Sequence, residues 1–327
     1  MFEIRDWSFD HLIASAIQHL IFIILFMKTV YYLTPSSFCF WVKRSIDELN
    51  KIIDQHTNDQ IYCIHALVHN PKVTQSFEGK WIHFVDSIDE VQDTNAIIIF
   101  SAHWTNRIII SAAEEKFKAV YNLECPFVTK IYKEVDNLVS KWINTLFYIG
   151  KPQHQEGKNV IDYATSKKMN LFVFQNISDI PSIDPQTEFG VLTQTTLNYD
   201  YVQNILNQIL NIYPHAHLPA LSDVCKATYE RQKVIQENLD KFDTFVVIGW
   251  KESNNTKELY NIWIQNNKKT FYGESLKDIL INWKEILFSN NRIAITWWAS
   301  TPIQDIQEVF QFYKENWYEP KILALKD

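Results

Sequence analysis

Glycine is the residue that this chain lacks most clearly. The 327 residues include 6 glycines, where an average usage of about 7% would give roughly 23. Neither a Walker A nor a GxGxxG sequence is present, so an ordinary nucleotide site is disfavoured. Positive charge is also scarce, because the formal net charge is -7 and no basic patch stands out. This balance argues against a nucleic-acid partner.

Cysteine is sparse as well. The chain has 4 cysteines and no CxxC pair, which disfavours a zinc knuckle or a thioredoxin-type redox couple. Four cysteines in so long a chain do not make a disulfide framework, so we expect a reducing compartment. We therefore predict a cytoplasmic location.

Long apolar runs are missing too. The densest is Leu20–Phe26, and Gln18 and His19 separate it from the apolar stretch before it. About eight uninterrupted apolar residues are too few to span a bilayer. We interpret residues 1–26 as an apolar N-terminal extension, either a packing or interfacial helix or sequence upstream of the natural start. Membrane contact through residues 12–26 is a less favoured alternative.

What is present indicates a globular α/β protein. Apolar residues make up 46% of the chain and charged residues 21%, a balance typical of globular domains. Short apolar runs predict buried parallel strands at Thr29–Leu33, Ala96–Phe100, Leu146–Ile149, Asn170–Phe174, Thr244–Ile248 and Arg292–Ile295. Amphipathic stretches between them predict helices at Val42–Ile53, Lys130–Ile143, Tyr199–Ile212, Thr228–Leu239 and Ile303–Glu315. This alternation predicts open sheets in an α/β layout.

The strand and helix pattern restarts near residues 120 and 215. No repeat is visible in the sequence, but three blocks of similar size suggest a structural one. Each block has one cysteine in a polar context. The predicted blocks are 27–120 with Cys39, 121–215 with Cys125 and 216–327 with Cys225.

These three cysteines are candidate metal ligands. They are separated by 86 and 100 residues, and three soft ligands could converge on a metal centre that leaves one coordination position free. Thiolates suit iron–sulfur clusters and zinc. The alternative is that each is a small buried apolar residue, which the Thr and Lys neighbours of Cys125 and Cys225 weaken. Cys63 lies inside the apolar run Ile61–Ile64, and we assign it to the core.

Polar side chains follow the predicted strands directly, where ligands bind in α/β sheets. Singly, each histidine among them is more typical of a structural role than of ligand binding. Together, imidazole, hydroxyl and amide donors would suit a phosphate or diphosphate. The candidate donors are His69, His103, His154, Ser253, Asn255 and Ser300.

Glu156 is the candidate proton donor. It lies two residues after His154, and a carboxyl beside a metal and an anion is pushed towards its neutral form. The alternative is an ordinary solvated glutamate in a loop. Spacing alone does not decide between the two.

Taken together, these motifs resemble the 4-hydroxy-3-methylbut-2-enyl diphosphate reductase family, also called IspH/LytB. They occur in the family's order over roughly residues 27–305. The sequence ECPFVTK followed by TQTTL and CxATxxRQ is specific. The matching stretches are SFCFWVKRSI, IYCIHALVHN, IIIFSAH, ECPFVTK, IGKPQHQE, TQTTL, CKATYERQ, VVIGWKESNN and ITWWASTP.

The resemblance implies three α/β domains with pseudo-threefold symmetry around a central [4Fe–4S] cluster. The reaction would be reductive dehydroxylation of an allylic diphosphate, with electrons from an external donor of the ferredoxin or flavodoxin type. In a eukaryote, a plastid-type organelle would replace the cytoplasm. The implied roles are cluster ligands for Cys39, Cys125 and Cys225, diphosphate binding for His69, His103, His154, Ser253, Asn254, Asn255 and Ser300, proton delivery for Glu156 and orientation of the substrate hydroxyl for Thr195.

Several positions that are small in the family are tryptophan in this chain. An indole can fill the volume that glycine leaves for a ligand. One alternative is therefore a non-catalytic or repurposed iron–sulfur protein with an occluded substrate pocket. Another is a zinc-bound or metal-free structural protein. The positions concerned are Trp41, Trp104, Trp250, Trp297 and Trp298.

Overall fold

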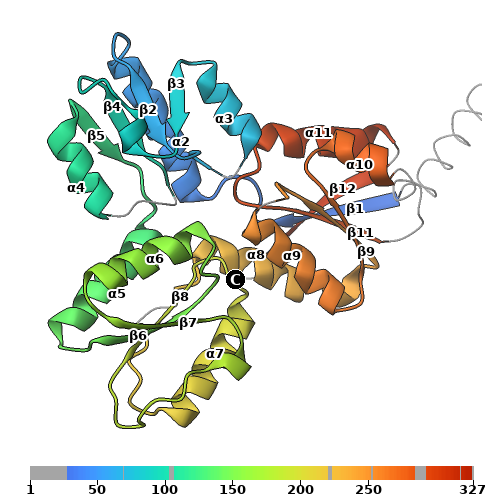
Figure 1. Cartoon of the computed structure of the whole chain (residues 1–327). Coiled ribbons are helices and arrows are strands. Elements are labelled where there is room, and N and C mark those ends of the chain that lie inside the picture. Colours follow the sequence, from blue (N-terminus) through green and yellow to red (C-terminus); the bar gives the residue numbers. More distant parts are fainter. Residues whose placement is uncertain are drawn as a thin grey trace, which may run out of the picture.

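The computed structural model describes residues 28–68, 70–102, 107–219, 223–251, 253–283, 292–316 and 318–325. The predicted N-terminal extension, His69, His103 and Trp104 lie outside these residues. The described chain forms three lobes, each built on its own parallel sheet (Figure 1). This confirms the predicted α/β fold with open parallel sheets.

The first lobe holds a four-stranded sheet. Its elements are α2 (Phe40–Gln55), β2 (Ile61–Ile64), α3 (Pro71–Glu78), β3 (Ile82–Val85), β4 (Ile97–Phe100), α4 (Arg107–Lys116) and β5 (Ala119–Asn122). The strand order is β3-β2-β4-β5. Every residue of β4 is buried, as a run of Ile-Ile-Ile-Phe demands when helices cover both faces of the sheet. Cys63 in β2 belongs to this core and is fully buried, as predicted.

The second lobe holds a three-stranded sheet. Its elements are α5 (Pro126–Ser140), β6 (Thr145–Ile149), α6 (Gln155–Ser166), β7 (Asn170–Phe174), β8 (Gly190–Thr193) and α7 (Tyr199–Ile212). The strand order is β7-β6-β8. Phe147 of the central strand stacks on Phe189 with ring centroids 4.1 Å apart, so aromatic packing compensates for the small number of strands.

The third lobe holds a five-stranded sheet. Its elements are β1 (Lys28–Thr34), α8 (Lys226–Gln236), β9 (Thr244–Ile248), α9 (Asn254–Gln265), β10 (Lys269–Gly273), α10 (Leu276–Trp283), β11 (Ile293–Trp297), α11 (Ile303–Glu315) and β12 (Tyr318–Ala324). The strand order is β10-β9-β11-β1-β12. In Figure 1 the blue β1 lies among the orange and red strands.

The position of β1 differs from the expected division of the chain. We expected residues 28–34 to belong with the first block. Instead, Val30 pairs with Ile293 of β11, and Thr34 pairs with Ala324 of β12. A buried parallel strand can pair with any other apolar strand, so its sequence does not reveal its partners. The boundaries near residues 120 and 215 stay a prediction.

The scarcity of glycine leaves non-glycine residues at the left-handed backbone positions. Trp81, Trp142, Lys168 and Asn267 have φ between 55° and 66°, and each lies just past the end of a helix. Glycine is the usual residue there because it has no Cβ to clash. Trp81 and Trp142 are 84% and 87% exposed, so solvent accommodates their indoles.

No helix among the described residues combines the length and apolar character that a membrane span requires.

The buried carboxylate of Asp223 should be a critical contact of the second lobe. It accepts hydrogen bonds from Lys130 Nζ and from the Thr193 backbone N–H, both at 2.9 Å. Breaking a buried pair costs about 3–5 kcal/mol, and the partial exposure of Lys130 places Asp223→Ala at the lower end. We expect a lowered unfolding midpoint. The exposed pair Lys43–Asp47 provides the control, because Asp47→Asn should cost about 1 kcal/mol or less; equal losses would contradict the assignment.

Candidate active site

The three candidate cysteines occupy equivalent positions at helix N-termini. Cys39, Cys125 and Cys225 are the N-cap residues of α2, α5 and α8. The backbone N–H of Val42 lies 3.4 Å from the Cys39 Sγ, and the backbone N–H of Thr228 lies 3.4 Å from the Cys225 Sγ. Free N–H groups at a helix start lower the pKa of a thiol, but burial outweighs them here and raises the pKa of Cys125 to about 12 and that of Cys225 above its usual value.

Each cysteine is also held by a neighbouring lobe. The backbone N–H of Cys39 donates to the Ala299 carbonyl at 3.3 Å, that of Cys125 to the Ala102 carbonyl at 2.7 Å, and that of Cys225 to the Thr195 carbonyl at 3.0 Å. Every acceptor lies two residues past the end of a strand, namely β11, β4 or β8. The third lobe thus holds the cysteine of the first, the first that of the second, and the second that of the third. This cyclic pattern is the structural repeat that the block sizes suggested.

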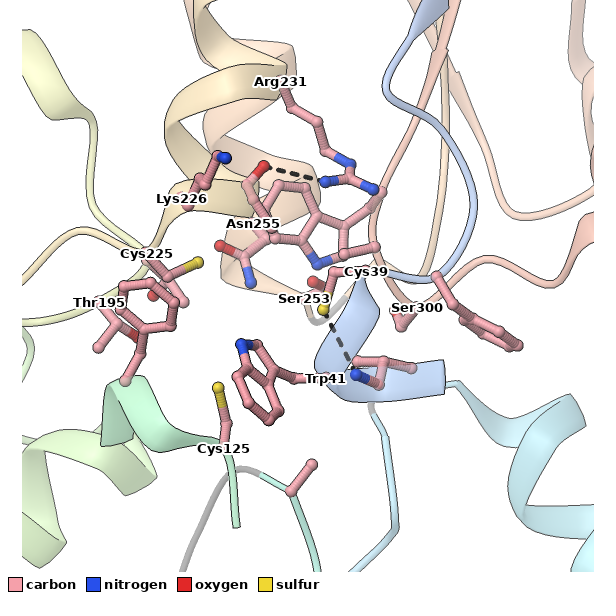
Figure 2. A pocket seen from close by; sticks show the side chains of 18 of the residues that line it. Cys39, Trp41, Cys125, Thr195, Cys225, Lys226, Arg231, Ser253, Asn255 and Ser300 are labelled. Carbon is pink, nitrogen blue, oxygen red and sulfur yellow. Dashed lines mark hydrogen bonds between the residues drawn. The ribbon is translucent and has the colours of Figure 1, made fainter. Parts of the chain in front are cut away.

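The three cysteines line one cavity of about 640 Å³ (Figure 2). Other candidates from the second and third lobes line it as well. The predicted site residues on its wall are Cys39, Cys125, Cys225, His154, Glu156, Thr195, Ser253, Asn255 and Ser300. Sequence reasoning therefore selected residues that the fold brings together.

Glu156 and Thr195 form a buried pair at this cavity. Glu156 is 4% exposed, and its carboxylate accepts hydrogen bonds from the Thr195 backbone N–H at 2.7 Å and from the Thr195 hydroxyl at 3.0 Å. Burial outweighs these bonds and raises the pKa of Glu156 to about 7. A carboxyl with this pKa can carry a proton near neutral pH. The solvated-loop alternative for Glu156 is wrong.

The candidate diphosphate donors lie at helix starts. His154 and Ser253 are the N-cap residues of α6 and α9, where free backbone N–H groups favour an anion. The Oδ1 atom of Asn255 is buried without a hydrogen-bond partner among the described residues; this oxygen is an acceptor, so the Nδ2 group is the one that could donate to a phosphate. Asn254 is the first residue of α9, and its side chain lies outside the described structure.

Asn70 is a residue that sequence reasoning missed. It follows His69, and its side-chain amide donates to the Ser300 carbonyl at 2.9 Å, which joins the first lobe to the third beside the cavity. Its signal was the HALVHN stretch, in which we singled out the histidine alone.

Arg231 is the second missed residue. It lines the cavity, is 2% exposed, and donates to the Ser37 carbonyl at 2.8 Å and to the Ala227 carbonyl at 3.0 Å. It lies six residues after Cys225 in the CKATYERQ stretch. The sequence pattern predicts an amphipathic helix here, and arginine is expected on the exposed face of such a helix. The burial of Arg231 could therefore not be inferred.

The tryptophans among the described residues differ in their position relative to the cavity. Trp297 is fully buried and stacks on Tyr32 with ring centroids 5.2 Å apart, inside the core of the third lobe. Trp250 is not part of the described cavity wall, whereas Trp41 and Trp298 are. The volume of about 640 Å³ is within the range of small-molecule sites. Figure 2 shows the Trp41 indole between Cys39 and Cys125, so the expectation of an occluded pocket stays a prediction.

The three cysteines come from three separate helix starts around one cavity. Among the described residues, no three His, Cys, Asp or Glu side chains are placed to hold one metal ion. A cluster distributes its cysteine ligands over different iron atoms, so its thiols surround a volume and need not meet at one point. Three thiols on three sides of one cavity have this arrangement (Figure 2).

Fold and cavity together define a three-lobed α/β protein with three N-cap cysteines on the wall of one cavity. Residues 30–314 match the family described as LytB protein, and the chain belongs to this family.

Its relatives include a 4-hydroxy-3-methylbut-2-enyl diphosphate reductase of Wolbachia pipientis subsp. Culex pipiens, 30% identical over 86% of this chain and 90% of the relative. The reductase of the same name from Wigglesworthia glossinidia brevipalpis is 31% identical over 87% and 89%. The solved structure of the Plasmodium falciparum E-1-hydroxy-2-methyl-but-2-enyl-4-diphosphate reductase superposes with a TM-score of 0.81. It is 25% identical and covers 92% of this chain and 93% of its own.

Gly157 should fix the turn that presents His154 and Glu156. A Cβ at this position would lie 2.2 Å from the Lys151 carbonyl oxygen, and backbone cannot move aside as a side chain can. Gly157→Ala is therefore expected to lower stability by about 1–3 kcal/mol, measured by denaturant unfolding. Gly79→Ala is the matched control, since its Cβ would meet nothing closer than 3.7 Å and should change stability by about 0.5 kcal/mol or less. Equal effects would contradict this role.

Proposed function

We propose that this protein reduces 4-hydroxy-3-methylbut-2-enyl diphosphate to isopentenyl and dimethylallyl diphosphate, the reductive step of the non-mevalonate isoprenoid pathway. The observation that carries the proposal is the meeting of three N-cap cysteines and the Glu156–Thr195 pair in one cavity. Family membership and the names of the relatives support it. The chain is then an oxidoreductase.

Cys39, Cys125 and Cys225 would hold a [4Fe–4S] cluster. When bound, the cluster supplies electrons one at a time and one iron without a cysteine ligand. The protein contributes three cysteines at helix N-termini on the wall of one cavity.

The diphosphate would bind beside this centre, on the starts of α6 and α9. His154, Ser253 and Asn255 present side-chain donors there, and Ser300 adds a hydroxyl from the segment after β11. His69 and His103 complete the proposed set on the strength of the sequence motifs. Fixed donors around the diphosphate would hold the C5 chain in one orientation.

Glu156 would deliver a proton to the leaving oxygen. Replacing the substrate hydroxyl by hydrogen consumes two electrons and two protons and releases water. The Thr195 hydroxyl lies 3.0 Å from the Glu156 carboxyl, so the two groups can share a hydrogen-bonded path to that oxygen. An external donor of the ferredoxin or flavodoxin type would supply the electrons. The proposed location is the cytoplasm, or a plastid-type organelle in a eukaryote.

Anaerobic reconstitution with iron and sulfide tests the proposal. We expect a brown protein with cluster absorbance that turns over the hydroxylated C5 allylic diphosphate with a chemical reductant. Cys125→Ser should lose most of the absorbance, whereas Cys63→Ala should keep it, because Cys63 is buried in the core of the first lobe. A brown wild-type protein without turnover would refute the reductase activity, and a full cluster spectrum in Cys125→Ser would refute the ligand assignment.

The pH dependence of turnover tests the role of Glu156. Its pKa of about 7 means that the carboxyl carries its proton below this pH and loses it above, so the rate should fall as pH rises through about 7. Glu156→Gln should lower turnover about 100-fold or more while leaving the absorbance unchanged.

Thr195→Val provides a second readout for the same pair. The Thr195 hydroxyl donates to the carboxylate and lowers the pKa of Glu156, so its removal should move the falling limb to higher pH. For the Glu156→Gln variant itself, unchanged turnover would exclude Glu156 as the proton donor.

A further inference from the structure

Arg231 is a buried cation without a buried anion to balance it. Arg231 is 2% exposed, and no carboxylate among the described residues forms an ion pair with its guanidinium. Its neighbour Glu230 pairs with Lys226 instead. A buried charge without a partner costs several kcal/mol. Such a charge is typical of a site where a bound anion balances it.

The surroundings of Arg231 indicate where such an anion would lie. Its guanidinium donates to the carbonyl of Ser37, two residues before Cys39, and to the carbonyl of Ala227, two residues after Cys225. The side chain therefore joins the two loops that present these cysteines. Figure 2 shows Arg231 above Cys39, at the edge of the cavity.

An unpaired N–H group and the nearby sulfurs agree with this position of the anion. The Nε–H of Arg231 is buried without a partner among the described residues. The sulfurs of Cys39 and Cys225 are the groups with which the guanidinium interacts most strongly, once burial is set aside. As thiolates these two sulfurs carry the negative charge that the cation lacks.

Trp298 strengthens the field of this cation. The guanidinium lies over its indole, with Cζ 5.5 Å from the ring centroid, and the indole is 5% exposed. An aromatic ring on one face of the guanidinium excludes the water that would screen the charge. The tryptophan at this position therefore has a function beyond occupying volume.

We propose that Arg231 is the fixed counter-cation of the thiolate-held centre and raises its reduction potential, which eases the entry of electrons. A positive charge stabilises the state with one more electron, and the net charge around a cluster is among the factors that set its potential. The inference rests on the proposed iron–sulfur centre, and it concerns a residue that binds neither iron nor substrate.

The midpoint potential of the reconstituted holoprotein is the primary test. Arg231→Met should lower it by about 59 mV or more, the equivalent of a tenfold change in a one-electron equilibrium. Arg231→Lys keeps the charge and should stay closer to the wild-type value. Lys233→Met is the matched control, because it removes a charge from the same helix, and that lysine is partly exposed beside Glu237; its potential should not change.

Thermal unfolding with and without the cluster separates a counter-ion from a structural residue. In the cluster-free protein, Arg231→Met removes an uncompensated buried charge, so its unfolding temperature should equal or exceed that of the wild type. In the loaded protein the same change should lower it. A merely structural arginine would give a decrease in both states, which would overturn the proposal.

The outcomes also separate this inference from the proposed activity. A loaded wild-type protein with an unchanged potential in Arg231→Met overturns the counter-cation alone. If Arg231→Met lowers the potential but the loaded wild-type protein does not turn over the substrate, the reductase activity alone is overturned. A wild-type protein that holds no cluster overturns both. If Arg231→Met holds no cluster, Arg231→Lys decides the outcome. A cluster with a midpoint potential near the wild-type value supports the proposal. A missing cluster, or a potential shifted by about 59 mV or more, overturns it.

Discussion

The structure depends on one repeated hydrogen bond, in which a strand end of each lobe accepts the backbone N–H of a cysteine from the next lobe. The bond places every cysteine between two lobes: its helix packs into one core, and its N–H is held by another. A small change in the angle between lobes would move a sulfur relative to the other two. The integrity of the centre and the arrangement of the lobes are thus a single property.

Burial has opposite effects on the acids and the base of the cavity. It raises the pKa of Glu156 to about 7 and that of the Cys125 thiol to about 12, and it disfavours the charge of Arg231. Neutral forms are therefore favoured wherever no ligand compensates for desolvation. Binding of a cluster would convert thiols to thiolates and release protons, so loading of the centre is coupled to pH through its ligands.

The sequence predicted those features that depend on local pattern. The bounds of β7, β9, α7 and α11 agree with the predicted elements, because apolar runs and amphipathic stretches report burial directly. The partners of β1 could not be predicted, because the sequence of a parallel strand does not specify which other strand it pairs with. The same limit applies to Trp297, whose side chain points into the core of a lobe, and to Arg231, whose burial results from tertiary packing. The roles of the individual site residues stay predictions.

The pairing of β1 has a consequence for the order in which the protein can be completed. This strand is made long before its partners β11 and β12, which are the last of the described strands. The carbonyl of Ala299 that holds Cys39 is made late as well. A nascent chain on the ribosome therefore exposes its first cysteine before that residue has a binding partner. Delivery of the proposed cluster would therefore have to follow synthesis of the segment after β11, and a product truncated before β11 would lack the carbonyl that holds Cys39.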